Sequence, residues 1–124
     1  MAMLAINLEP PSSDESEARI AGACLFHGFS DPSRVGIVQQ LLLGERRVVD
    51  LTEHLGLAQS TVSKHLACLR DCGIVVSRPS GRASVYSLAH PEAMRDLLTA
   101  AERLLGLTGN AVTLCRNYGV GVRS

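Results

Sequence analysis

The feature that most constrains the fold is a pair of short helical patterns separated by a glycine-containing turn. The first pattern is RRVVDLTEHLG, at residues 46–56, and the second is QSTVSKHLACLRDCG, at residues 59–73. Two short helices joined through such a turn predict a helix-turn-helix. Apolar residues recur at helical spacing in both patterns and predict their buried faces: Val48, Leu51 and Leu55, then Val62, Leu66 and Leu69.

The second helix begins with short polar side chains. A helix that enters the major groove of DNA needs such side chains at its N-terminal end, because they must fit the groove and meet base edges and phosphates. We therefore predict a recognition helix with these DNA-binding residues: Gln59, Ser60, Thr61, Ser63, Lys64 and His65.

A hairpin is predicted after this helix. Residues 74–78 and 83–88 are rich in β-forming residues, and Pro79-Ser80-Gly81-Arg82 between them is typical of a turn. Arg78 and Arg82 are placed near its tip, as in the wing of a winged helix, and are predicted to contact DNA.

Helices are predicted on both sides of this unit. One covers residues 14–29, and Asp31-Pro32 marks the start of the next. His90-Pro91 opens a long terminal helix whose apolar residues repeat at heptad-like spacing. A symmetric dimer would cover that stripe. We expect a mainly α, homodimeric winged helix-turn-helix with a small β-hairpin. Its expected parts are a flexible arm (residues 1–13), the DNA-binding and dimerisation domain (14–109) and a tail (110–124).

The composition narrows the class of protein. The chain has 124 residues and a formal net charge of zero. It contains no apolar run of the roughly 18 residues that a membrane span needs. Its first ten residues lack the basic region of a signal peptide, so a cytoplasmic location with reduced thiols is expected. Arginine and lysine gather in the middle of the chain, which suits a nucleic-acid footprint. No catalytic constellation is found, and we do not expect an enzyme.

Cys68 and Cys72 lie four residues apart on one helical face, and three interpretations compete. Their β-carbons are expected about 5–6 Å apart, whereas a disulfide requires about 3.5–4.5 Å, so the redox interpretation is disfavoured. The two residues flank the apolar stripe instead of occupying it, which disfavours core filling. The helix dipole opposes a thiolate at this end, and a bound cation offsets that cost. A metal site is favoured.

The other two cysteines are interpreted separately. Cys115 lies in the tail, where no core needs filling, so a metal-ligand role is favoured. Cys24 lies in an amphipathic first helix, where core filling is the better interpretation and a fourth thiolate ligand the alternative. His27 is interpreted as a surface or interface residue and His65 as a DNA-facing residue, and neither as a metal ligand.

Residues 29–88 resemble the ArsR/SmtB family of winged-helix, metal-responsive repressors. The resemblance rests on DPSR, the LGLAQSTVSKHL block and the GRASVYSL segment. It implies a homodimer that binds an operator with an inverted repeat when metal-free and releases it when metal binds. The pair Cys68 and Cys72 resembles the cadmium- and lead-sensing branch, in which the tail of the other subunit supplies a third cysteine, here Cys115.

Thiolate ligands favour soft ions, so cadmium or lead is the expected effector, with mercury or zinc next. Two rival functions remain: a thiol-based redox-sensing repressor using Cys68 and Cys72, and a metal chaperone or buffer. The basic hairpin and the polar start of the recognition helix argue against the second.

Overall fold

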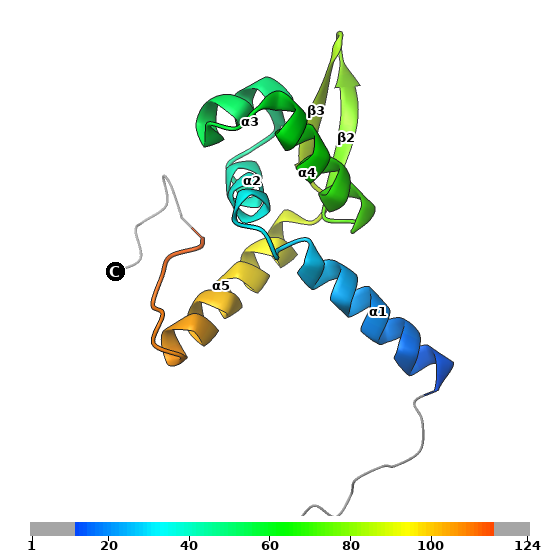
Figure 1. Ribbon diagram of the computed structural model, residues 1–124, viewed down its shortest axis with the longest axis vertical. Helices are drawn as coiled ribbons and strands as arrows, with labels where there is room; N and C mark the ends of the chain where they lie inside the picture. The colour runs from blue at the N-terminus through cyan, green and yellow to red at the C-terminus, as the bar shows by residue number, and fades with distance from the viewer. Residues whose placement is uncertain (1–11, 116–124) are drawn as a thin grey trace, which may run out of the picture.

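The computed structural model describes residues 12–115 and shows five helices around a small antiparallel sheet (Figure 1). The strand order in the sheet is β1-β3-β2. In chain order the elements are α1 (Ser13–His27), α2 (Pro32–Leu42), β1 (Arg46–Arg47), α3 (Val48–Leu55), α4 (Gln59–Asp71), β2 (Val75–Ser80), β3 (Ala83–Leu88) and α5 (Pro91–Leu107).

The predicted helix boundaries follow from local chemistry. Asp31 caps α2 by accepting a hydrogen bond from the Ser33 N–H at 2.7 Å, and Pro32 is its first residue. Gly56 ends α3 with a left-handed backbone, φ 67°, which glycine adopts without steric cost. α3 and α4 are therefore separated by the short turn that the sequence predicted.

The hairpin differs from the prediction in one respect. β2 and β3 pair from Val75↔Leu88 to Ser80↔Ala83, so the turn is tighter than the predicted residues 79–82. A third strand, β1, pairs Arg46 with Tyr86 and Arg47 with Val85. Two residues are too few to show an alternating pattern, so the sequence could not reveal this strand.

One core joins α2, α3, α4, the base of the sheet and part of α5. Val62, Leu66 and Leu69 are fully buried, as predicted, and they pack with Ile37 and Leu51. α4 is thus fixed by one face, and its opposite face stays free.

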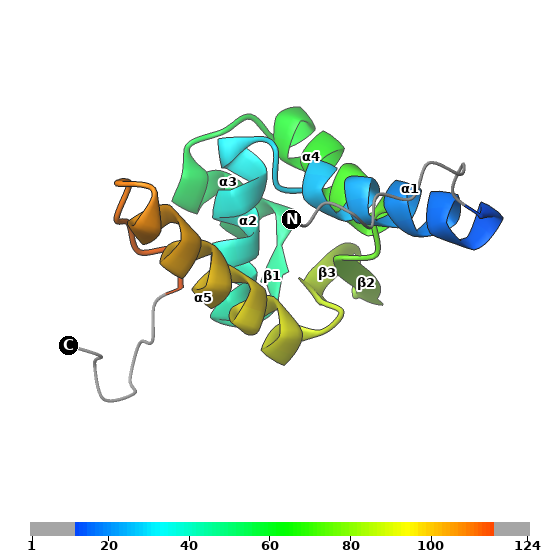
Figure 2. The ribbon, with the colours of Figure 1, turned by 90° about the horizontal axis from the view of Figure 1, so that it is seen from below.

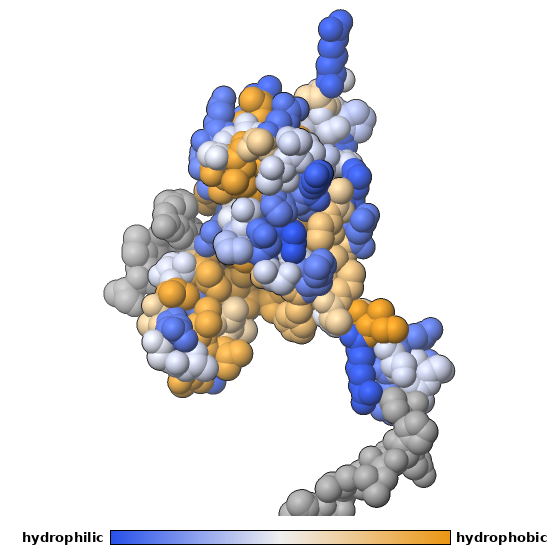
Figure 3. Space-filling model, in the orientation of Figure 1, coloured by the Kyte–Doolittle hydropathy of each residue, from blue (hydrophilic) through white to orange (hydrophobic). Residues whose placement is uncertain are grey.

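α1 and the C-terminal part of α5 extend from this core (Figures 1 and 2). Every residue of α1 is at least partly exposed, including the apolar Ile20 and Phe26. Leu104 and Leu107 of α5 are exposed as well, and apolar surface covers much of that helix (Figure 3). Large apolar side chains on two neighbouring projecting helices indicate a surface that another protein chain can cover.

The predicted arm lies outside the described residues apart from Ser12 and Ser13. Ser12 caps α1 by accepting a hydrogen bond from the Glu15 N–H, and Ser13 is the first helical residue. Within residues 12–115, no helix has the length and apolar character needed to cross a membrane.

Candidate functional site

The N-terminal half of α4 presents the predicted DNA-reading side chains. Gln59, Ser60, Ser63 and Lys64 are exposed, and Thr61 is half-buried. Burial of Val62 on the opposite face directs these residues outward. Along the long axis of the molecule, the tip of the hairpin lies at the end opposite to α1 and α5, and α4 lies between these two ends (Figure 1).

The two hairpin arginines have different surroundings. Arg82 is exposed beside Gly81 in the turn. Arg78 pairs with Val85, two pairs beyond the Ser80–Ala83 pair next to the turn. It forms a bidentate ion pair with Glu45, with Nη2–Oε1 at 2.8 Å and Nε–Oε2 at 3.1 Å. The guanidinium holds the pKa of Glu45 below its usual value. The exposed Arg82 is therefore available to bind a DNA phosphate, whereas Arg78 would first have to break its ion pair with Glu45.

His65 is turned away from the exposed face of α4 that carries the other predicted DNA-reading side chains, contrary to the expected outward position. Its side chain is only 16% exposed; Nδ1 lies 3.2 Å from Arg34 Nη1, and Nε2 lies 3.8 Å from Asp31 Oδ1. His65 is three residues after Val62 and four before Leu69, so it shares their inward face. That spacing could have identified it from the sequence.

Arg34 is a structural residue that the sequence interpretation missed. It donates hydrogen bonds to the carbonyl oxygens of His27 and Gly28, at 3.1 and 3.2 Å, and to Ser30 Oγ at 3.1 Å. Together with its contact to His65, these bonds connect the end of α1 to the recognition helix. Arg34 and Asp31 are the two charged residues of DPSR, so that motif builds the α1–α4 junction.

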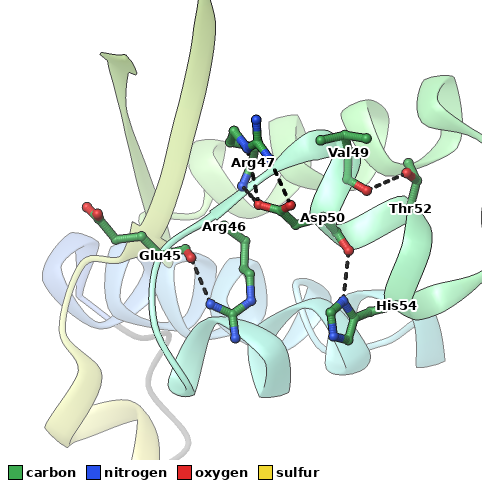
Figure 4. A network of polar contacts seen from close by, with 7 residues as sticks. All are labelled: Glu45, Arg46, Arg47, Val49, Asp50, Thr52 and His54. Carbon is green, nitrogen blue, oxygen red and sulfur yellow. Dashed lines mark hydrogen bonds and ion pairs between the residues drawn. The ribbon is translucent and has the colours of Figure 1, made fainter. Parts of the chain in front are cut away.

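A second polar network holds the start of α3 (Figure 4). Asp50 accepts a hydrogen bond from the Arg47 backbone N–H at 2.9 Å and pairs with the Arg47 guanidinium at 3.2 Å. These contacts, the backbone bond first, lower the pKa of Asp50. Part of the positive charge in the middle of the chain is thus neutralised internally, so the DNA-binding charge is more local than composition implied.

Three of the four cysteines gather where the last turn of α1 meets the end of α4. Cys24 Sγ lies 3.1 Å from Cys72 Sγ, and Cys68 lies one helical turn before Cys72. Burial, followed by the neighbouring thiols of Cys24 and Cys68, raises the pKa of Cys72 to about 12. We call Cys24, Cys68 and Cys72 the thiol cluster. Cys24 is exposed, so its interpretation as a core filler was wrong.

Cys115 has the opposite environment. It is 6% exposed and belongs to the hydrophobic core, so the expectation of a tail without a core to fill was wrong. Its backbone N–H donates to Glu102 Oε2 at 2.6 Å, and the same oxygen accepts the Leu114 N–H. Gln39 Nε2 donates to the Leu114 carbonyl at 2.9 Å. The described C-terminal end and α1 lie on opposite sides of the molecule in both ribbon views (Figures 1 and 2).

The sulfur atoms of the thiol cluster suit a soft metal ion, although they are not arranged around a metal position. Over residues 12–115, no three His, Cys, Asp or Glu side chains are already arranged to hold an ion. Cys24 and Cys72 form a close pair, and Cys68, one helical turn before Cys72, is the third sulfur of the cluster. Thiolates select cadmium, lead, mercury and zinc over hard cations.

Known proteins are similar to this chain both in sequence and in fold. The family model described as bacterial regulatory protein, arsR family, matches residues 31–77. The chain is 38% identical over 93 residues to a probable mercury resistance operon repressor of Streptomyces lividans, covering 75% of this chain and 74% of that protein. It is 44% identical over 75 residues to the transcriptional regulator CmtR of Mycobacterium tuberculosis, covering 60% of this chain and 64% of CmtR. A winged helix-turn-helix domain from Mycobacterium bovis superposes with a TM-score of 0.67 at 23% identity, covering 80% of this chain and 95% of that domain.

These comparisons confirm the predicted winged helix-turn-helix fold. They also confirm the class of protein, a regulator and not an enzyme. The individual DNA-binding and metal-binding residues remain predictions.

Proposed function

The chain belongs to the ArsR family of bacterial transcriptional regulators, and we propose that it is a metal-responsive repressor. In this proposal it binds operator DNA as a homodimer and releases the DNA when a thiophilic ion binds the thiol cluster. The observation that carries the proposal is the 3.1 Å approach of Cys24 Sγ and Cys72 Sγ, which join α1 to the end of the recognition helix.

The cluster sets the class of effector. Its donors are all sulfur, which favours cadmium, lead or mercury, with zinc as the borderline ion. The name of the Streptomyces lividans relative agrees with mercury. Cys115 would join as a further ligand only after its contacts with Glu102 open, because its thiol lies in the core.

Metal binding would act through the position of α4. An ion held by Cys24 and Cys72 draws the end of α1 against the end of α4, and the Arg34–His65 contact links the same two helices further along α4. Fixing this junction would change how the two recognition helices of a dimer are spaced. A coupling free energy of about 1–3 kcal/mol is typical of allosteric proteins and would lower operator affinity about 5–150-fold.

The dimer would use the projecting helices. Ile20 and Phe26 of α1 and Leu104 and Leu107 of α5 are 62–77% exposed, so they offer an apolar surface to a second copy. A two-fold dimer places its recognition helices on an inverted repeat with half-sites about 10 bp apart or a multiple of that distance.

A redox-sensing repressor is the second candidate function, and the same contact favours it. The nearest thiols are Cys24 and Cys72, whereas the sequence interpretation had paired Cys68 with Cys72. A hydroperoxide would oxidise the two thiols to one disulfide and would be reduced to an alcohol and water. The link between α1 and α4 would then be covalent.

A DNA-release assay tests the metal proposal and separates it from the redox candidate. Operator DNA is selected from a random duplex library, and its binding is followed by fluorescence anisotropy under nitrogen with a non-thiol reductant. Cadmium, lead, mercury and zinc are titrated in turn. We expect release by at least one soft ion in the wild type and none in the Cys68→Ser/Cys72→Ser double variant. Full release in that variant would contradict the proposal. Release only by peroxide, in a parallel sample without reductant, would favour the redox candidate.

A salt series in the same assay tests the DNA-binding face. Lys64→Ala is expected to weaken binding and to reduce the slope of log affinity against log salt by about 0.9, since one phosphate contact is lost. Arg70→Ala, on the last turn of α4, is the control and should leave the slope unchanged. Unchanged affinity and slope in Lys64→Ala would mean that another face of α4 meets DNA.

A further inference from the structure

An apolar cavity of about 280 Å³ opens beside the thiol cluster. α1 contributes Leu25 to its wall, and Ile74, Met94 and Leu97 are among its other apolar lining residues. Cys72 also lines the cavity, so one residue of the cluster contacts Cys24 and borders an apolar space.

A second apolar cavity provides an internal comparison. It has about 310 Å³ and is lined by Phe26, Phe29, Ala101 and Leu105, among others; Leu97 separates the two cavities by lining both. Among the described residues, its lining includes no cysteine. The two cavities are similar in size and both are mainly apolar, but Cys72 and His90 line only the first.

An apolar cavity with a thiol in its wall matches one chemical class of thiophile. An inorganic mercury(II) ion takes two thiolates, so Cys24 and Cys72 would have to move apart from 3.1 Å to hold it between them. An organomercury cation, R–Hg⁺, already carries one carbon substituent and takes one thiolate. Mercury(II) with two ligands is linear, so the substituent points directly away from the sulfur and needs an apolar space there.

We propose that Cys72 and the adjacent cavity form a binding site for organomercury cations that carry an aryl group. The Cys72 thiol loses its proton, its sulfur forms a bond to mercury, and the displaced anion X⁻ leaves with that proton as HX: Cys72–SH + R–Hg–X gives Cys72–S–Hg–R + HX. The ring lies among Leu25, Met94 and Leu97. The inference rests on the proposed function only in taking Cys72 as a ligand for soft ions.

The cavity predicts a preference between two cations that react alike with free thiols. Phenylmercury buries an apolar ring in the cavity, whereas methylmercury buries a single methyl group. We expect wild-type protein to prefer phenylmercury by about tenfold relative to the preference of glutathione, because the additional apolar area leaves water. Both cations are presented as glutathione complexes to metal-free protein, and the bound fractions are measured by native mass spectrometry.

Matched variants on α5 locate the effect. Ala93→Leu adds side-chain volume in the cavity next to Cys72, and Ala101→Leu adds the same volume in the cavity without a cysteine. Ala93→Leu is expected to lower the phenyl preference to that of glutathione, whereas Ala101→Leu should retain it. Circular dichroism and size-exclusion chromatography check that both variants keep the wild-type fold and assembly.

Peptide mapping provides a second test that needs no cavity variant. Phenylmercury should reside on the peptide that contains Cys72, and Cys24→Ser should keep the preference that Cys72→Ser loses. A wild-type preference equal to that of glutathione would overturn the proposal, as would equal losses in Ala93→Leu and Ala101→Leu. None of these measurements uses DNA, so failure of metal-triggered release would refute the proposed function and leave this site intact.

Discussion

The thiol cluster and Cys115 occupy opposite environments in the same chain. Cys24 is exposed and lies 3.1 Å from Cys72 between two helices, whereas Cys115 is buried under a carboxylate that holds its backbone. Their local sequences suggested the reverse, with Cys24 in the core and Cys115 in an open tail. The packing of the surrounding element therefore decides whether a cysteine can reach a ligand. α1 projects from the hydrophobic core, whereas the segment after α5 folds back onto that core.

Serine variants of Cys72 and Cys115 should differ strongly in metal-triggered release of operator DNA. Cys72→Ser should abolish metal-triggered release of operator DNA, which removes a change of about 5–150-fold in affinity. Cys115→Ser should retain most of that response, because Cys115 is not near the other three thiols within its own chain. Anisotropy titration with cadmium and mercury measures both variants. If Cys115→Ser no longer releases DNA when metal is added, the segment that carries Cys115 must leave its buried position during sensing.

The next effect concerns what keeps Cys115 buried. Glu102 accepts the backbone N–H groups of both Leu114 and Cys115. Glu102→Ala should free this segment and accelerate alkylation of Cys115 by iodoacetamide about tenfold or more, as resolved by peptide mass spectrometry. Its control is Asp96→Ala, which removes an exposed carboxylate from the same helix. Equal alkylation rates in both variants would show that core packing, not Glu102, holds Cys115.

The helices were predictable because their signals are local. Asp31-Pro32, Gly56 and the Val62–Leu66–Leu69 stripe each specify a boundary or a buried face within a few residues. The approach of Cys24 to Cys72 joins residues 48 apart in sequence, and the burial of Cys115 depends on Gln39 and Glu102. No periodicity within one element contains that information, so the site could be predicted only in part.

A smaller effect is expected at the junction that supports the cluster. Arg34→Ala removes the hydrogen bonds to His27, Gly28 and Ser30 and the contact with His65. We expect a loss of about 1–3 kcal/mol in the free energy of unfolding and weaker cadmium binding at the cluster, since α1 is no longer held. Cys115 should stay protected from alkylation. Urea denaturation and metal titration measure the two changes.

Arg70→Ala is the control for this junction because Arg70 is an exposed arginine on α4. It should leave both stability and cadmium affinity unchanged. If Arg34→Ala exposes Cys115 and the thiol cluster equally, the two regions are not independent, and the contrast between them fails.

The smallest effect is a difference in acid sensitivity at the same junction. The backbone N–H of Ser33, with further contributions from His65 and Arg34, lowers the pKa of Asp31. A carboxyl group whose pKa is lower in the folded state stabilises the protein above its unfolded pKa, about 3.9, and that stabilisation is lost as pH falls through the folded value. Asp31→Asn can still cap α2 but cannot titrate. The stability of Asp31→Asn should therefore fall less steeply below about pH 4 than that of the wild type, as measured by urea denaturation at a series of pH values.

Glu53→Gln, on the exposed face of α3, should follow the wild-type curve. An Asp31→Asn curve parallel to the wild type would show that the Asp31 carboxylate contributes through hydrogen-bond geometry alone and not through its charge.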